Sequence, residues 1–322
     1  VCNRRRCYNN PSGRGEVVAK YFGTDGIRGE FGKFLNEDLV AKISLATAIN
    51  LEEGTKVCIG KDPRESSDLI ERILAEKLAE NGIVVELLGV ISTPVISYAI
   101  LNGDYKVGIM ISASHNPYQD NGIKFFGEDG KKLSEKLELE IENSVDNLIQ
   151  LDRKKIDVIY NDKITNEYIN FLAKDMPSME GINIGLDCAN GSAFDIAPKI
   201  FTKLGANISV IGNEPNGKNI NDGIGSTHTE AIVKLVKDNN LDFGFSYDGD
   251  ADRIGLYNGK GEFIDSHHII LLLIHYMVKY KQMTGKVVIA FSVTPRVEVL
   301  CKHYGLELEV TKIGFKEILW KW

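Results

Sequence analysis

Two stretches of the chain hold side chains whose chemistry suits a phosphate group. In the first, Ser114 stands next to His115, and Lys124 follows farther along. A serine hydroxyl is a weak nucleophile until a base activates it, so a neighbouring imidazole and a nearby cation make it a candidate phosphoryl acceptor. Serine, histidine and asparagine are also common in polar turns. An ordinary loop is therefore the alternative for these residues taken alone.

The second stretch, Asp248-Gly249-Asp250-Ala251-Asp252-Arg253, places carboxylates at alternate positions. Carboxylates cannot form the buried face of a strand without partners. In a loop they can converge on one hard cation, and such oxygen ligands suit Mg²⁺. An EF-hand calcium loop fits less well, because Arg253 stands where that loop needs glycine and Gly259 where it needs glutamate. A solvated acidic turn remains the alternative.

Strand and turn signals place both stretches at equivalent points of an α/β fold. The apolar run at 106–111 predicts a buried strand that ends just before Ser114. The pair Asn116-Pro117 predicts a turn, because the residue before proline avoids the helical region. Phe243–Tyr247 predicts a second strand, which leads into the aspartates. Open α/β sheets bind ligands at the carboxyl ends of their strands, so we expect both loops at such an edge.

Two weaker signals also point to phosphate. The glycine-rich stretch 23–32 contains Thr24 and Arg28, and free backbone amides with an arginine fork suit an anion. The alternative is a strand and turn with structural glycines. His228, in a Ser-Thr-His sequence, is a candidate phosphate contact, and a structural role is an equal alternative.

Alternating helix and strand patterns predict consecutive α/β units. Helices are expected to begin at capping residues such as Asn36 and Ser134, and at Thr93-Pro94, where proline suits the first turn. The expected domains are 18–155 with the Ser114 loop, 156–258 with the aspartate loop, and 259–322 as part of a third domain.

Residues 1–17 show no apolar periodicity, and no hydrophobic segment follows their arginines, which excludes a secretory signal. We expect a disordered or non-native extension there, with the folded chain starting near Val18. The 322 residues carry a net charge of −7, which argues against a nucleic-acid surface. No apolar run reaches the roughly 20 residues of a membrane span. Five cysteines without paired metal spacing predict a reduced, cytoplasmic protein.

Four motifs, in this order, resemble the phosphohexomutase superfamily and, within it, the bacterial phosphoglucosamine mutases. Residues 21–29 resemble its opening signature, 111–126 (ISASHNPYQDNGIKFF) its phosphoserine loop and 248–253 (DGDADR) its metal loop. Residues 219–228 resemble a further landmark. The resemblance runs from about Val18 to the end of the sequence.

The resemblance implies α/β sandwich domains in succession, with the third domain incomplete and the fourth absent. It implies interconversion of glucosamine 6-phosphate and glucosamine 1-phosphate, a step toward UDP-N-acetylglucosamine and cell-wall precursors. Phosphorylated Ser114 would exchange its phosphoryl group with the sugar through a bisphosphorylated intermediate, and a hexose bisphosphate would act as the activator that phosphorylates Ser114. The expected partner is a sugar phosphate, and neither nucleic acid nor a membrane is expected.

The same resemblance assigns roles to individual residues. Asp248, Asp250 and Asp252 would hold Mg²⁺ together with a phosphate oxygen on Ser114. The candidates for general acid and base, or for phosphate contacts, are Lys124 and His115. Arg28 and Arg253 would clamp phosphate or orient the loops. The remaining candidate phosphate contacts are Thr24, Asn116 and His228.

The sequence departs from the family pattern near its end. The sugar-reading Gly-Glu-x-Ser-Gly and phosphate-binding Arg-x-Ser-Gly-Thr patterns of the family do not occur in it. Residues 312–316 resemble the phosphoglucomutase and phosphomannomutase branch instead. Two alternatives therefore stay open: a mutase of that sister specificity, and a truncated, inactive chain with a binding or regulatory role. We expect the 322-residue chain to be a poor mutase by itself.

Overall fold

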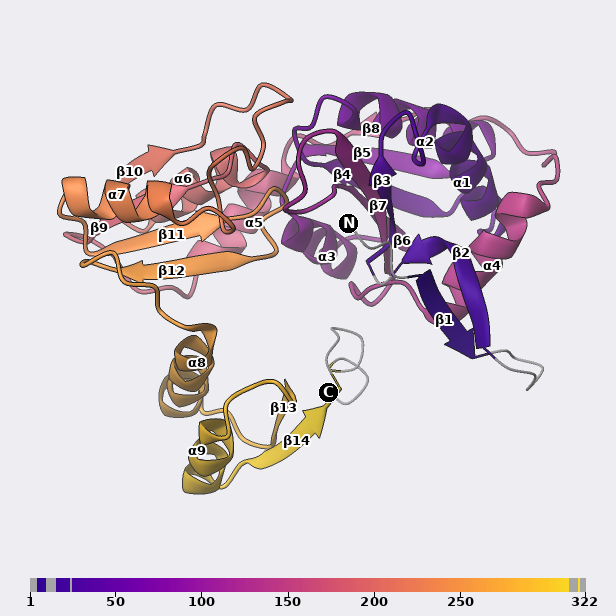
Figure 1. Ribbon diagram of the computed structural model, residues 1–322. Helices are drawn as coiled ribbons and strands as arrows, with labels where there is room; N and C mark the ends of the chain where they lie inside the picture. The colour runs from indigo at the N-terminus through magenta and orange to yellow at the C-terminus, as the bar shows by residue number, and fades with distance from the viewer. Residues whose placement is uncertain (1–4, 10–15, 24, 313–317, 319–322) are drawn as a thin grey trace. The chain divides into compact units, whose positions relative to one another are not determined.

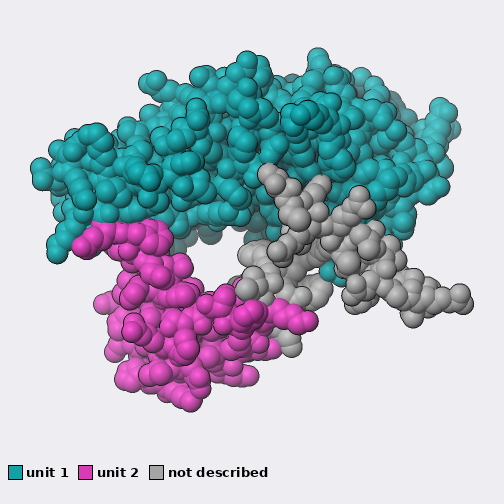
Figure 2. All heavy atoms as spheres, viewed as in Figure 1, with its two compact units in different colours: residues 1–261 teal, residues 262–322 magenta. Residues whose placement is uncertain are grey.

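The computed structural model describes residues 5–9, 16–23, 25–312 and 318 (Figure 1). The chain divides into two compact units, Val1–Gly261 (unit 1) and Glu262–Trp322 (unit 2) (Figure 2). Unit 1 contains both loops predicted to act on phosphate, and it is built around two sheets. Among the described residues, no helix has the length and apolar character needed to cross a membrane.

The first sheet of unit 1 has six strands in the order β3-β7-β6-β4-β5-β8. Strands β6, β4 and β5 run parallel, whereas β7 runs antiparallel to both of its neighbours, β6 and β3. The strands are β3 (Ile27–Glu30), β4 (Lys56–Lys61), β5 (Val84–Val90), β6 (Val107–Ile111), β7 (Asp120–Gly127) and β8 (Ile159–Tyr160).

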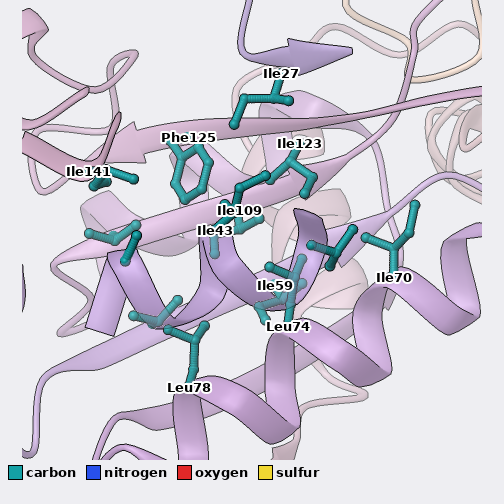
Figure 3. Close-up of a cluster of buried hydrophobic side chains, with 14 of the residues drawn as sticks. Ile27, Ile43, Ile59, Ile70, Leu74, Leu78, Ile109, Ile123, Phe125 and Ile141 are labelled. Atoms are coloured by element: carbon teal, nitrogen blue, oxygen red, sulfur yellow. The ribbon is translucent and has the colours of Figure 1, made fainter. Parts of the chain in front are cut away.

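Helices cover both faces of this sheet. Successive residues of a strand point to opposite faces, so one strand can contribute to the core on each face. Ile109 belongs to the cluster formed with α1, α2 and α4, which contribute Ile43, Leu74 and Ile141 (Figure 3). Its neighbour Met110 belongs to the cluster on the other face, formed with α3. The helices are α1 (Glu37–Ile49), α2 (Ser67–Glu80), α3 (Thr93–Asn102) and α4 (Glu135–Asp146).

Both predicted helix caps are confirmed. The Asn36 side chain accepts a hydrogen bond from the Leu39 amide at 3.0 Å, and the Ser134 hydroxyl accepts one from the Leu137 amide at 3.3 Å. Each satisfies a backbone donor that the first helical turn leaves unpaired.

The second sheet of unit 1 has the order β10-β9-β11-β12, with β11 parallel to β9 and antiparallel to β12. Helices α6 and α7 belong to separate clusters packed on this sheet. Helix α5 links the halves of unit 1, because its Ile169 shares a cluster with Ile96 of α3 and Ile196 of α6. The elements are α5 (Ile164–Ala173), β9 (Asn183–Asp187), α6 (Ala193–Lys203), β10 (Asn207–Ile211), α7 (Glu230–Asp238), β11 (Phe243–Tyr247) and β12 (Ile254–Asn258).

The beginning of the chain differs from our expectation. We expected residues 1–17 to be a disordered or non-native extension; disorder is wrong for part of this stretch, because β1 (Arg5–Asn9) pairs in antiparallel fashion with β2 (Glu16–Gly23). The apolar periodicity on which the prediction relied does not detect a short strand whose pairing depends on a neighbouring segment.

Unit 2 is a small α/β element of its own. Its strands β13 (Lys286–Ala290) and β14 (Glu307–Thr311) run parallel, and α9 (Arg296–Tyr304) connects them. Helix α8 (Ser266–Lys281) packs with α9 around a cluster that includes Ile274 and Val297. Of residues 312–316, on which the branch comparison rested, all but Lys312 lie outside the described part of the chain.

Candidate active site

Ser114 lies at the turn between β6 and β7, as predicted. Its side chain is buried, and its backbone has a φ of 55°, in the left-handed region that non-glycine residues rarely adopt. Such a conformation costs on the order of 1–3 kcal/mol and persists only where its surroundings impose it. The Ser114 hydroxyl donates a hydrogen bond to Asp248 Oδ2 at 2.5 Å, so the two predicted loops meet directly.

The three aspartates converge as the sequence predicted. The carboxylate oxygens that Asp248, Asp250 and Asp252 offer lie within 4.8 Å of one another. Asp248 and Asp250 are fully buried, whereas the Asp252 side chain is 33% exposed. The loop is pinned through its backbone, because the Thr93 amide donates to the Asp250 carbonyl at 2.9 Å. An acidic turn in solvent is therefore excluded for two of the three carboxylates.

Lys124, from β7, is the buried cation of this site. Its ammonium pairs with Asp250 and lies 3.2 Å from Asp252 Oδ2 and 3.6 Å from Asp25 Oδ2. Burial alone would lower the pKa of Lys124, but the charges of Asp250, Asp25 and Asp252 outweigh it and raise that pKa. Lys124 is therefore protonated at neutral pH and can act as a cation or an acid.

Arg28 meets the site through Asp25. The Asp25 carboxylate accepts hydrogen bonds from both Arg28 and Lys132. Burial would raise the pKa of Asp25, but the charges of Lys124, Arg28 and Lys132 outweigh it and lower that pKa. Thr24, the other residue predicted to contact phosphate here, lies outside the described residues.

His115 contacts Arg253 from the aspartate loop. Its Nδ1 lies 2.9 Å from Arg253 Nη1 and 3.5 Å from the Ser114 hydroxyl oxygen. Burial, then the charge of Arg253, lower the pKa of His115, so the imidazole is neutral at neutral pH. A guanidinium can only donate, so Nδ1 accepts the Arg253 proton and its lone pair is engaged. In this arrangement Asp248, rather than His115, receives the Ser114 hydrogen bond.

Two family models match the chain. Residues 19–152 match the model described as "Phosphoglucomutase/phosphomannomutase, alpha/beta/alpha domain I", and residues 159–261 match the model of domain II of the same family. The chain belongs to the phosphoglucomutase/phosphomannomutase family. The resemblance inferred from the four motifs is thereby confirmed.

Several curated relatives of this chain carry the name phosphoglucosamine mutase. Proteins called phosphoglucosamine mutase from Caldicellulosiruptor bescii and Deinococcus radiodurans are each 39% identical, over 315 and 306 residues. The match to the first covers 94% of this chain and 70% of the relative, and the match to the second covers 92% and 67%. A Bacillus cereus protein of the same name is 40% identical over 289 residues, or 85% of this chain and 63% of the relative.

Solved structures in the family share the fold. A phosphoglucomutase/phosphomannomutase family protein from Burkholderia thailandensis has a TM-score of 0.83 at 22% identity, over 93% of this chain and 68% of that chain. A putative phosphomannomutase from Thermus thermophilus has a TM-score of 0.82 at 25% identity, over 92% of this chain and 69% of that chain. The predicted α/β sandwich architecture is confirmed.

The aspartate loop suits a divalent cation, as the family resemblance implies. Asp250 Oδ1 is buried and has no hydrogen-bond partner among the described residues, which leaves one oxygen for a ligand. Burial, then the charges of Asp250 and Asp252, raise the pKa of Asp248, so a cation there would relieve repulsion. Within the described chain this is the only such group of metal-ligating side chains.

Among the described side chains, the charges around Ser114 are balanced before any ligand binds. The ion pairs between them connect carboxylates and cations in equal number, so a phosphoryl group would add charge of roughly −1.5 to −2 to this set. A divalent cation would offset it. The charged side chains in question are Asp25, Asp248, Asp250 and Asp252 with Arg28, Lys124, Lys132 and Arg253.

Two predicted phosphate contacts, Asn116 and His228, form hydrogen bonds within their own loops. The Asn116 amide donates to Asp120 Oδ2 at 2.8 Å, so it is used within its own loop. His228 is exposed, and its backbone amide donates to the Gly225 carbonyl in a loop tied to Asp187. The roles of Asn116 and His228 as phosphate contacts stay predictions.

A buried ion pair that was not predicted from the sequence, Arg64 with Asp62, lies behind the Ser114 loop. Arg64 donates to the carbonyl oxygens of Ser114 at 2.8 Å and Asp120 at 2.9 Å, and to that of Pro117. Asp62, fully buried, accepts from Arg64 Nε at 2.8 Å and from the Ser112 hydroxyl at 2.7 Å. The available signal was a carboxylate and a guanidinium two residues apart, directly after strand β4.

Asn221 was missed as well, although its motif was noticed. Its side-chain amide donates to the carbonyl oxygens of Ser114 at 3.0 Å and Asn116 at 3.2 Å. Beside it, a Cβ added at Gly249 would lie 2.5 Å from the Ser114 carbonyl oxygen, so only glycine allows the two loops to approach this closely.

Proposed function

We propose that the protein is a phosphoglucosamine mutase that interconverts glucosamine 6-phosphate and glucosamine 1-phosphate. The observation that carries this proposal is the hydrogen bond of 2.5 Å between the buried Ser114 hydroxyl and Asp248, one of three converging carboxylates. Relatives at about 39% identity that carry this name support the choice of sugar.

Ser114 is the proposed phosphoryl carrier. In the first half-reaction a free sugar hydroxyl attacks the phosphorus, the bond between Ser114 Oγ and phosphorus breaks, and the proton that the sugar loses ends on Ser114 Oγ. In the second, Ser114 Oγ loses its proton and attacks the other phosphoryl group of the bisphosphorylated sugar, the bond between that phosphorus and the sugar oxygen breaks, and the sugar oxygen is protonated. Asp248 Oδ2 accepts the Ser114 hydrogen bond and is positioned to receive the Ser114 proton.

The surrounding charges have proposed roles of their own. Asp248, Asp250 and Asp252 would hold Mg²⁺, which neutralises negative charge on the transferring group. Lys124 keeps the buried carboxylates compensated and, being protonated, can donate to a phosphate oxygen. Arg28 Nε is buried without a hydrogen-bond partner among the described residues, which favours a role in binding phosphate.

Intact-mass spectrometry tests the carrier. Protein incubated with glucose 1,6-bisphosphate and Mg²⁺ should gain one phosphoryl group, and peptide mapping should place it on Ser114. Incorporation at another residue, or none, would contradict the proposal.

Comparison of sugars then tests the specificity. The phosphorylated protein should transfer its group to glucosamine 6-phosphate faster than to glucose 6-phosphate or mannose 6-phosphate. The reverse order would favour the sister specificity, which the family description also names.

The proposed compartment is the cytoplasm. Cys58, Cys188 and Cys301 are buried and free, and burial raises the pKa of Cys58 and Cys188 to about 12. These thiols behave as small apolar side chains, which is typical of proteins kept in a reducing environment.

A further inference from the structure

The carbonyl oxygen of Ser114 accepts hydrogen bonds from both halves of unit 1. Arg64 Nη2 donates at 2.8 Å from the first half, and Asn221 Nδ2 donates at 3.0 Å from the second. A carbonyl oxygen has two lone pairs, so these two donors use its full capacity.

These bonds bear on the direction of the Ser114 side chain. Ser114 has a φ of 55°, and its amide donates to the Ser112 hydroxyl at 2.8 Å. With the peptide groups on both sides fixed, Oγ is held toward Asp248. Without a donor on the carbonyl, the residue can relax toward the extended or right-handed regions, which swing Oγ away from the carboxylate.

Asn221 is itself anchored, so it cannot simply follow a movement of Ser114. Its backbone amide donates to the Ala189 carbonyl at 2.9 Å. The preceding part of its loop is tied to the turn just before α2, where the Glu65 amide donates to the Gly217 carbonyl at 2.9 Å and Lys218 pairs with Glu65 at 3.1 Å. The loop therefore presents a fixed amide to the Ser114 carbonyl.

We propose that Asn221 is a positioning residue for phosphoryl transfer: with Arg64, it holds the Ser114 peptide so that Oγ meets Asp248. This rests on the proposed function of Ser114 as carrier. Asn221 acts on the reacting hydroxyl through the backbone, so it should affect the rate of transfer and leave the binding of the sugar phosphate unchanged.

The decisive variant is Asn221→Gly, because glycine tolerates the φ of 58° at this position and only the amide is lost. Asn240→Gly is the matched control, since Asn240 is exposed, has a φ of 49° and lies outside the site. Single-turnover phosphorylation by glucose 1,6-bisphosphate is measured against its concentration. We expect the limiting rate of Asn221→Gly to fall about 10- to 100-fold with the half-saturating concentration unchanged. The control should match the wild type.

A mutant cycle separates positioning from general destabilisation. Arg64→Lys and Asn221→Gly remove donors from the same carbonyl. The double variant should therefore lose less of the limiting rate than the product of the two single losses, whereas independent structural effects would give that product. A normal limiting rate in Asn221→Gly, a change confined to half-saturation, or fully multiplicative effects would each overturn the proposal.

The backbone conformation of Ser114 can also be measured directly by NMR, without any catalysis. With serine labelled in ¹³C and ¹⁵N, the Ser114 shifts and its amide-to-Hα coupling report the left-handed conformation. That signature should be lost or averaged in Asn221→Gly and kept in Asn240→Gly. If the left-handed signature persists in Asn221→Gly, the positioning role is overturned. A wild-type protein that accepts no phosphoryl group would count against the proposed function instead, and this second result is independent of the first. If Asn221→Gly fails to fold, Asn221→Asp, of equal size but without donors, takes its place in both measurements.

Discussion

The Ser114 loop and the aspartate loop are connections of the same kind that are stabilised in different ways. Each joins a strand that has a parallel neighbour to the next strand along the chain, which runs antiparallel: β6 to β7, and β11 to β12. Each also contains one non-glycine residue in the left-handed region, Ser114 at 55° and Ala251 at 54°.

The contacts that stabilise the Ser114 loop differ from those that stabilise the aspartate loop. The Ser114 loop is held by its backbone carbonyls, which Arg64 and Asn221 bind, and the charge of Arg64 is cancelled by buried Asp62. The aspartate loop is also held at its backbone, where the Thr93 amide binds the Asp250 carbonyl, but its side chains are charged and Lys124 compensates them. Backbone bonds fix the place of a nucleophile, whereas side-chain charges create a field that a cation and a phosphoryl group can alter.

The largest expected effect is that of Ser114→Ala, which removes the carrier and leaves the loop supports in place. Phosphoryl incorporation and mutase turnover should be abolished, because no other route to a phosphoenzyme exists in the proposed reaction. Intact mass after incubation with glucose 1,6-bisphosphate measures the loss, and circular dichroism should show an unchanged fold. Ser178→Ala, at an exposed serine, is the matched control. Labelling of Ser114→Ala would show that another residue carries the group.

The difference between the loops also explains which parts were predictable. Ser114, the aspartates and the caps at Asn36 and Ser134 follow from local patterns of apolar runs, turns and spacing. Arg64 and Asn221 act on Ser114 from 50 and 107 positions away, and no local pattern reveals a side chain that bonds a distant carbonyl. The engagement of His115 Nδ1 by Arg253 is equally non-local.

Asp250→Asn should have the next largest effect, because it removes a charge from the aspartate loop while keeping its shape. Mg²⁺ affinity should fall, and the rate of Ser114 phosphorylation should drop about 10²- to 10³-fold, the scale for losing one preorganised electrostatic group. Calorimetric titration and single-turnover kinetics measure the two. Asp152→Asn, at an exposed carboxylate, should change neither. Unchanged Mg²⁺ affinity would mean that the loop is a structural acidic turn.

Arg64→Met tests the backbone support and should mainly reduce stability. It leaves Asp62 buried and unpaired, which typically costs about 3–5 kcal/mol, so urea unfolding should shift strongly. Arg72→Met, at an exposed arginine, should be nearly neutral.

Lys124→Met tests the corresponding support of the aspartate loop. It leaves Asp250 and Asp252 without their cation, and a bound metal ion can compensate these carboxylates. Added Mg²⁺ should restore part of the stability of Lys124→Met and none of that of Arg64→Met. Equal rescue of both variants would remove the distinction between the two kinds of support.

The smallest effect is expected from Gly249→Ala, which probes the place where the two supports touch. The added Cβ would lie 2.5 Å from the Ser114 carbonyl oxygen, 2.8 Å from Ile220 Cδ1 and 3.0 Å from Asn221 Nδ2. Ile220 can move at its flexible end, but the carbonyl is held by two donors, so the loops must separate. Overpacking of this kind costs about 1–3 kcal/mol, which urea unfolding can measure. Gly127→Ala is the matched control, because its nearest contact would be an ordinary 3.5 Å and its φ is not in the left-handed range. If Gly249→Ala were as stable as Gly127→Ala and phosphorylated Ser114 at the normal rate, the approach of the loops would be looser than the hydrogen bonds at Ser114 require.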